Sequence, residues 1–577
     1  MTQVDLIIRG GTVADGLGGA LFEGDVAIHD GRIVGVGAVT GHGREEIDAK
    51  GKLVTPGFVD IHTHYDGQAI WDRQLAPSSW HGVTTAVMGN CGVGFAPVRQ
   101  QDRQTLIELM EGVEDIPGAA LSEGLSFSWE SFDDYLHALE TRSRDIDLCA
   151  QLPHGALRVY VMGERAARLE AATPEDIAEM RRLTAQAIRA GALGFTTTRS
   201  INHRTVKGDP TPSLRAAADE LMGIAMGLKD AGRGVLQFIS DFDSPSLTEE
   251  FAMLRSLVEA SGRPLSVSIA QRHGRGSNIW RELLDLIAQA NADGLPMLAQ
   301  VAPRPIGVLL GLQGSRNPFL PCPAYQAIAE RSLEERVALM RDPALRERLL
   351  AEVGQPSDMP GARRWTAFDR IFAFGDPPDY EPPASSSLAA RAGREGVSAA
   401  ELAYDILLED EGRAFLFAPF ANYADYNLDV CAEMMADPYT VIGLGDGGAH
   451  VSVISDGSFP TYVLSHWGRD RPHGRFDLGW LVKRQTSDTA RAVGLLDRGV
   501  LAPGMKGDVN IIDMDRLALA APRMASDLPA GGRRLLQRAH GYVATIVSGI
   551  TIYREGEATG DLPGKLVRGQ QAAPAYA

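Results

Sequence analysis

Two histidines separated by one residue close an apolar run in the segment TPGFVDIHTHYDG. Alternate side chains of a strand project to the same face, so His62 and His64 should point together and Thr63 away from them. Converging imidazoles bind zinc or a similar cation, which lowers the pKa of a bound water to about 7. A His-X-His triplet also occurs on solvated loops, but the acidic neighbours Asp60 and Asp66 favour a metal site here.

The pattern of the central chain predicts the elements that position this site. Strand-like apolar runs alternate there with helical runs, such as PEDIAEMRRLTAQAIRA, whose apolar residues recur at spacings of three and four. The strand-like runs are GFVDIHTH, TTAVMGNCGVG, DLCAQLPHGALR, GALGFTTTRS, GVLQFISDF, PLSVSIAQ, PMLAQVAP and YTVIGLGDGGAH. Eight alternations predict an α/β fold with a closed parallel (β/α)8 barrel of the TIM type, whose active site lies at the carboxyl ends of the strands. The polar residues at those ends are His62, His64, Cys91, His154, Arg199, Arg304 and Asp446.

Both ends of the chain carry short alternating runs separated by Gly and Asp turns, which is typical of hairpins. We therefore expect residues 1–55 and 501–577 to form one small β-sandwich, and residues 56–500 to form the metal-dependent barrel. Two connections, 99–135 and 313–400, are longer than ordinary strand-helix loops. Such connections serve as lids, binding loops or oligomer contacts, and a homo-oligomer remains open.

Composition limits the class of protein. The 577 residues are 44% hydrophobic, enough for a large core, and no run reaches the roughly 20 apolar residues of a membrane helix. The first residues lack the layout of a secretory signal, so the expected location is the cytoplasm and no membrane partner is expected. The formal charge of -18 is spread along the chain, which disfavours nucleic acid as a partner.

Several motifs together resemble one family. They are TPGFVDIHTHYDG at the first strand, HGVTTAVMGNCGVGFAP at the second, PHGALR at the third, and the terminal VSGITIYREGEATGDLPGKLVRG. On these the chain resembles the N-acyl-D-amino-acid deacylase (D-aminoacylase) branch of the amidohydrolase superfamily over nearly its whole length. The resemblance implies a metal-dependent hydrolase that acts on carbon-nitrogen bonds other than peptide bonds.

The resemblance also implies roles for four residues. His62 and His64 match metal ligands of the first strand, and Cys91 matches a cysteine ligand. Asp446 in GLGDGGAH matches the catalytic aspartate, which can also ligate the metal, and a carboxylate beside a metal-activated water can take its proton and pass it to the leaving amine. The bland alternatives are a buried packing cysteine at position 91 and a turn aspartate at position 446.

The fifth and sixth strands depart from the branch, which supplies one histidine from each and a lysine shortly after the sixth. Here the corresponding runs are GVLQFISDF and PLSVSIAQRHG, with Gln237 and Ser268 among their polar residues. The second metal pocket of the branch is therefore depleted. We expect one divalent cation per chain, a Zn2+, held by the four residues named above.

Five residues are candidate substrate contacts. His154 in PHGALR matches a position near the pocket of the branch, and the guanidinium of Arg199 or Arg304 can bind a carboxylate or pair with an acidic side chain. His273 lies in a Gly- and Arg-rich loop beyond the sixth strand, which favours a loop or substrate contact. His450 lies in the loop after the eighth strand, where a solvated histidine is the alternative.

The leading hypothesis is hydrolysis of the amide of an N-acyl amino acid, a small-molecule substrate, by a metal-activated water with Asp446 as general base and then acid. The nearest rival is a hydrolase of a cyclic amide, imide or lactone, which the missing lysine slightly favours. A third reading is a barrel that has lost its metal and serves in binding or assembly.

Overall fold

The chain was analysed as a computed structural model that describes residues 3–242, 247–274, 278–359 and 361–575. Within these residues the predicted barrel strands all form, and neighbouring strands pair in parallel. A parallel bridge between Thr63 and Gly447 joins the last strand to the first. The strands, in order, are β6 (Phe58–Asp60), β7 (Val83–Met88), β8 and β9 (Asp147–Ala150 and Leu152–Pro153), β10 (Gly194–Arg199), β11 (Val235–Ser240), β12 (Leu265–Ser268), β13 (Met297–Val301) and β17 (Thr440–Ile442).

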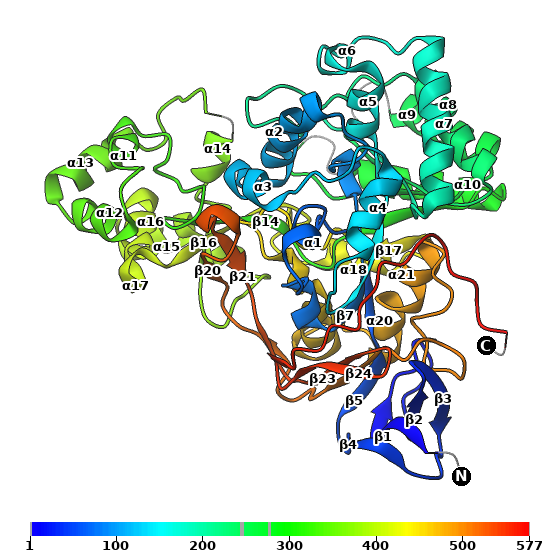
Figure 1. Cartoon of the computed structure of the whole chain (residues 1–577). Coiled ribbons are helices and arrows are strands. Elements are labelled where there is room, and N and C mark those ends of the chain that lie inside the picture. The colour runs from blue at the N-terminus through cyan, green and yellow to red at the C-terminus, as the bar shows by residue number, and fades with distance from the viewer. Residues whose placement is uncertain (1–2, 243–246, 275–277, 360, 576–577) are drawn as a thin grey trace.

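Helices cover the outside of these strands (Figure 1). One of them, α7 (Pro174–Ala190), shows how local sequence sets its bounds. Thr173 and Asp176 form a capping box in which each side chain accepts from the other's backbone N–H, and Pro174 takes the first helical position. The helix ends at Gly191, whose φ of 126° disfavours any residue with a Cβ. Further around lie α8 (Ala218–Ala231), α9 (Leu247–Ser261) and α10 (Ile279–Ala292).

The two ends of the chain meet in one small β-domain, as expected. At its centre β5 (Leu53–Pro56) pairs antiparallel with β18 (Val509–Ile512). The sheet continues through β1 (Val4–Val13), β2 (Phe22–His29) and β3 (Arg32–Gly37) on one side, and β23 (Tyr542–Val547), β24 (Ile550–Arg554) and β25 (Glu557–Ala558) on the other. Ile8 and Val54 from the first part pack in one core with Ile511 and Ile546 from the second.

The closing run TGDLPGKLVRG lies elsewhere than the sequence suggested. Leu148 of β8 donates to Lys565 O at 2.9 Å, and Val567 N donates to Leu148 O at 2.8 Å. The tail therefore follows a barrel strand, although the strands just before it belong to the β-domain. Glycine permits this close approach, because a Cβ at Gly564 would stand 2.2 Å from Ile146 O.

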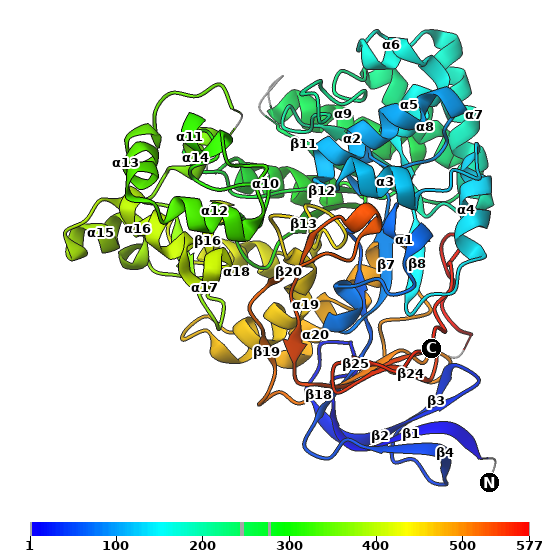
Figure 2. The same ribbon diagram turned by 60° about the vertical axis from the view of Figure 1, so that its left-hand side comes forward.

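The two long connections have structure of their own. The first contains α2 (Arg103–Glu114), α3 (Gly118–Gly124) and the start of α4 (Phe132–Glu140). The second is largely helical and projects from the barrel as a lobe, visible from α11 to α17 in Figures 1 and 2. The lobe joins the barrel through the antiparallel pair β14 (Ile306–Gly311) and β16 (Phe415–Ala421), and it has its own apolar core. Among the described residues, no helix is both long enough and apolar enough to cross a membrane.

Candidate metal centre

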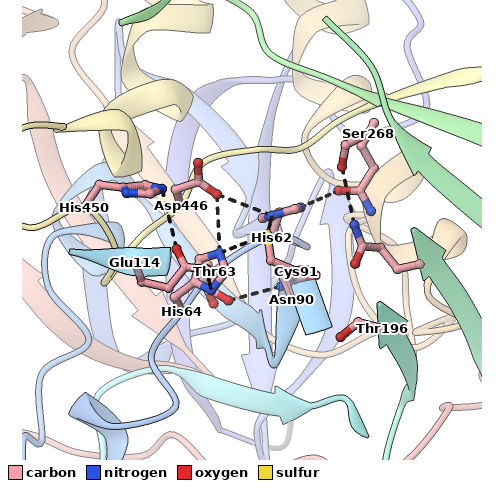
Figure 3. Close-up of polar contacts among 12 residues, drawn as sticks. His62, Thr63, His64, Asn90, Cys91, Glu114, Thr196, Ser268, Asp446 and His450 are labelled. Carbon is pink, nitrogen blue, oxygen red and sulfur yellow. Dashed lines mark hydrogen bonds and ion pairs between the residues drawn. The ribbon is translucent and has the colours of Figure 1, made fainter. Parts of the chain in front are cut away.

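The two histidines of the opening motif lie just beyond β6, where backbone contacts fix their direction. Thr63 donates through its N–H and its hydroxyl to Val87 O, at 3.0 and 2.9 Å, so its side chain turns toward β7. The N–H of His64 donates to Gly447 O at 2.8 Å. His62 and His64 therefore project together, as the alternation of a strand requires, and both are fully buried (Figure 3).

Three potential ligand atoms form one cluster here, and a carboxylate oxygen faces two of them. Cys91 Sγ lies 3.4 Å from His62 Nε2 and 3.7 Å from His64 Nε2, and the three ligand atoms all lie within 4.8 Å of one another. Asp446 Oδ1 faces the same two nitrogens at 3.4 and 3.6 Å. Ligands of a tetrahedral zinc ion, bound at about 2.0 to 2.3 Å, stand about 3.3 to 3.6 Å apart. The separations between each histidine and its two neighbours therefore fit a metal ion.

The far nitrogen of each imidazole faces an oxygen. His62 Nδ1 lies 2.7 Å from Gln300 Oε1, and the Gln300 amide donates its N–H to Ser266 Oγ at 3.0 Å. Because an amide oxygen only accepts, the proton sits on Nδ1 and Nε2 offers its lone pair. His64 Nδ1 lies 3.4 Å from Glu114 Oε1. Oxygen partners of this kind fix the tautomer and orientation of metal-binding histidines.

The backbone is strained at several positions of the site. Cys91, Leu444, Asp446 and His450 all have positive φ, at 55°, 61°, 45° and 48°. Residues with a Cβ occupy this region rarely, and such strain concentrates at functional sites. Glycines at 89, 92 and 448 adopt positive φ beside them and form the sharp turns.

Electrostatics favour a neutral histidine beside an ionised carboxylate. Burial lowers the pKa of His64 to about 4, although Asp446 acts to raise it. Burial acts to raise the pKa of Asp446, but the close approach of His64, together with His62 and His450, holds that pKa below its ordinary value. At neutral pH His64 is therefore an uncharged potential ligand and Asp446 a potential proton acceptor.

The acids around the histidines destabilise one another's charged forms. Burial raises the pKa of Cys91 and of Glu114 well above ordinary values, and the charges of Asp446 and Asp66 raise both further. Burial also raises the pKa of Asp66 to about 7. A cation among these groups would offset the cost and convert the thiol to a thiolate ligand. The donor set therefore fits the divalent metal that the sequence implied.

The neighbouring strands carry amides and hydroxyls where the resemblance implied histidines. Gln237 of β11 is buried, and its Nε2 donates to Ser268 Oγ of β12 at 3.4 Å. Gln237 Oε1 has no partner among the described residues. These side chains are poor ligands for zinc compared with imidazole, so this side of the barrel mouth is not arranged for a second ion.

A cavity of about 790 Å3 opens beside the metal centre. Leu444 and His450, which flank Asp446 in the chain, form part of its wall. Its apolar wall includes Val113, Phe242, Ile269, Trp280, Leu283, Ile306 and Trp365, and its polar wall includes Ser268, His273, Arg364 and Arg370. Cavities of this size hold drug-sized ligands.

Two of the predicted substrate contacts face other parts of the protein. His154 is fully buried, with Nε2 2.9 Å from Glu220 Oε1 and Nδ1 bonded to a barrel hydroxyl. Arg199 donates to Glu250 Oε1 at 2.7 Å. The partner carboxylates belong to α8 and α9, so strand-end position alone is a poor guide to substrate contact.

Arg304 also differs from the prediction, because its guanidinium faces the protein interior. Two of the predicted contacts, His273 and His450, lie in the wall of the cavity. The Arg304 guanidinium is fully buried, bonds Asp456 Oδ1 at 2.8 Å and lies 3.7 Å from the ring centre of Tyr380. It is held away from the cavity. His273 and His450 both line the cavity, and their role in substrate binding stays a prediction.

Sequence reasoning missed Glu114 and Gln300. Glu114 has a recognisable signal, because it follows Leu106 and Met110 at spacings of four on the buried face of α2, where an acidic residue is out of place. Gln300 interrupts an apolar barrel strand in the same way. A buried polar residue on an apolar face marks a specific contact.

Comparisons with known proteins identify the family and the fold. Residues 45–553 match the model of the amidohydrolase family. The D-aminoacylase of Alcaligenes xylosoxydans xylosoxydans is 26% identical over 98% of this chain and 97% of its own. A D-aminoacylase structure with a binuclear metal centre, showing one-metal activation and second-metal attenuation, is 24% identical, covers 98% of this chain and 100% of its own, and has a TM-score of 0.65.

Two further proteins are similar to the chain over nearly its whole length. An uncharacterised protein of Mycobacterium tuberculosis is 27% identical over 96% of this chain and 92% of its own. The N-acyl-D-glutamate deacylase of Bordetella bronchiseptica, solved with zinc and a phosphonate inhibitor, is 23% identical, covers 98% of this chain and 100% of its own, and has a TM-score of 0.63. The chain belongs to the amidohydrolase family.

Proposed function

We propose that this protein hydrolyses the amide bond of an N-acyl amino acid with one divalent metal, a Zn2+, per chain. The observation that carries the proposal is the cluster of His62, His64 and Cys91, with Asp446 facing the two histidines, beside a large cavity. When bound, the cation supplies a Lewis acid that polarises the amide carbonyl and acidifies water.

Asp446 performs the proton transfers. Its carboxylate is ionised at neutral pH, and its side chain keeps 17% of its surface exposed while both histidines beside it are closed to solvent. A water molecule can therefore reach it. Asp446 takes the proton of the attacking water and delivers it to the leaving amine, because amide cleavage needs a protonated nitrogen.

The cavity supports an anionic substrate with a bulky apolar group. Burial and the charges of Arg370 and Arg364 lower the pKa of His273, which reflects positive potential at this end of the cavity. Arg364 has no acidic partner among the described residues, and Arg370 donates to two backbone carbonyls. A carboxylate would bind here, and Trp280 and Trp365 would pack against an acyl chain or ring.

The test combines metal content with turnover. Protein purified without chelators should hold one equivalent of zinc and hydrolyse N-acyl amino acids. Asp446→Asn should lose about 100- to 10,000-fold in kcat, and the metal content of the variant shows whether it also lost a ligand. Absence of stoichiometric metal under any supplementation would contradict the proposal. Turnover of cyclic imides or lactones, with none of open amides, would favour the rival substrate class.

A further inference from the structure

We infer that Glu114 is a positioning residue of the metal centre, which holds His64 and His450 and so ties the α2 insertion to the site. The inference rests on the proposed function, because it concerns the metal bound by His64. Glu114 comes from a connection outside the barrel strands, about fifty residues after the opening motif whose His64 it contacts.

The geometry places one carboxylate between two imidazoles (Figure 3). Glu114 Oε1 lies 3.4 Å from His64 Nδ1, and Oε2 lies 3.5 Å from His450 Nε2. Glu114 and His64 are each 1% exposed. Both Glu114 Oε1 and His64 Nδ1 lack a hydrogen-bond partner at present distances, so a small approach of these two atoms satisfies both.

Hydrogen bonds join the backbone at Glu114 and the side chain of Asp115 to two other segments of the chain. The N–H of His450 donates to Glu114 O, which joins the end of α2 to the loop after the eighth strand. The next residue, Asp115, accepts from Ser452 of that loop and, at 3.3 Å, from Ser315 at the start of the lobe. The carboxylate therefore stands at a junction of three segments that surround the barrel mouth.

This arrangement has a definite chemical consequence. With its Nδ1 directed at a carboxylate, His64 presents the Nε2 lone pair toward Cys91 and Asp446. Gln300 does the same for His62 with a neutral amide. Beside a bound cation the Glu114 carboxylate would be ionised, and an ionised partner raises the basicity of the imidazole more than a neutral amide does, so His64 would be the stronger ligand of the pair.

If Glu114 served only to stabilise the fold, replacing it would lower the stability of the metal-free protein and leave metal affinity unchanged. Measurements of metal affinity and of stability therefore distinguish a positioning role from a purely structural one. Full-length wild type, Glu114→Gln and Glu114→Asp are stripped of metal and titrated with zinc against a chromophoric chelator. Glu111→Gln, one turn earlier in the same helix, is the matched control, because the one side-chain bond of Glu111 within the described part of the chain is from Gly118 N at 2.9 Å. Cobalt substitution adds the visible spectrum of the site, and thermal unfolding of each metal-free protein reports its stability.

We expect Glu114→Gln to weaken metal affinity about 10- to 100-fold, to shift the cobalt spectrum, and to leave the metal-free protein as stable as the control. Glu114→Asp should lie between wild type and Glu114→Gln, and it serves as the test if the glutamine variant fails to fold. Equal affinity in Glu114→Gln and Glu111→Gln, with active metal-loaded wild type, overturns this inference alone. Wild type that binds no metal overturns it together with the proposed function.

Discussion

Gln237 and Ser268 face each other at the neighbouring ends of β11 and β12, the two strands from which the resemblance implied a histidine each. Their hydrogen bond of 3.4 Å closes this side of the site with neutral groups. An amide and a hydroxyl bind zinc weakly, whereas imidazole binds it well. These two residues therefore support the proposal of a single ion.

Restoring the imidazoles should restore the second ion. We expect the double variant Gln237→His and Ser268→His to bind two equivalents of zinc where wild type binds one, because Cys91 is already present as a third ligand. Metal analysis after gel filtration measures the stoichiometry, with Gln237→His alone as the control. One equivalent in the double variant would show that the pocket is closed for another reason.

Residue types, their spacing and motif resemblance were enough to name the candidate ligands but not the residues around them. His62 and His64 could be paired because a strand alternates, and Cys91 and Asp446 were found through motif resemblance. Arg304 was expected at the substrate because a guanidinium binds a carboxylate. Its actual partner, Asp456, lies about 150 residues further along the chain, so the sequence does not reveal the pair. A guanidinium at a strand end looks the same in the sequence whether it faces a ligand or a buried carboxylate.

At the scale of elements, Gly112 allows α2 to pack directly against the backbone of a neighbouring loop. A Cβ added to Gly112 would stand 2.1 Å from Thr205 C and 2.2 Å from Val206 N. The adjoining backbone confirms the close approach, because Val206 N donates to Glu108 O at 3.0 Å. Glu114 follows two residues later, so the close packing of α2 at Gly112 determines how near this carboxylate lies to the metal centre.

Gly112→Ala should therefore displace α2. We expect overpacking to cost about 1 to 3 kcal/mol and to weaken zinc affinity through Glu114. The matched control is Gly393→Ala in α15 (Leu388–Glu395), where a Cβ meets nothing within 4 Å. The control should gain about 0.5 to 1 kcal/mol. Thermal unfolding measures both, and an unchanged melting temperature in Gly112→Ala would contradict the packing argument.

Most barrel elements could be predicted because each is local. Apolar strands and amphipathic helices can be recognised from a short stretch of sequence, and their order implies a parallel barrel. The lobe sheet could not be predicted, because β14 and β16 pair across about a hundred residues of chain. The closing tail was placed in the β-domain for a similar reason, since its partner is β8.

At the scale of the whole molecule, His81 joins three distant segments. It follows the first barrel strand, and its Nδ1 lies 2.8 Å from Thr461 Oγ1. Its Nε2 lies 2.9 Å from Gln537 O, in the chain that leads back to the β-domain. The ring is fully buried, and burial lowers the pKa of His81 to about 3.

Acid should weaken this junction. A histidine titrates near 6.5 when unfolded and His81 near 3 when folded, so its contribution to stability is complete above about pH 6.5 and is lost as the pH falls toward 3. The loss at pH 4.5 should reach about 3 kcal/mol. We expect the melting temperature of wild type to fall more steeply between pH 7 and 4.5 than that of His81→Gln. His42→Gln, at an exposed position, should keep the wild-type slope.

The union of the two chain ends in one sheet has a consequence for synthesis. β5 ends at residue 56, and its partner β18 begins at residue 509. A ribosome that adds about 5 to 20 residues per second needs roughly 20 to 90 seconds to make the chain between them. Throughout that time β5 has emerged with an open edge, and open edges pair with other chains. The nascent chain, rather than the finished protein, is therefore the form most exposed to aggregation. A low expression level, which keeps nascent chains dilute, should protect it.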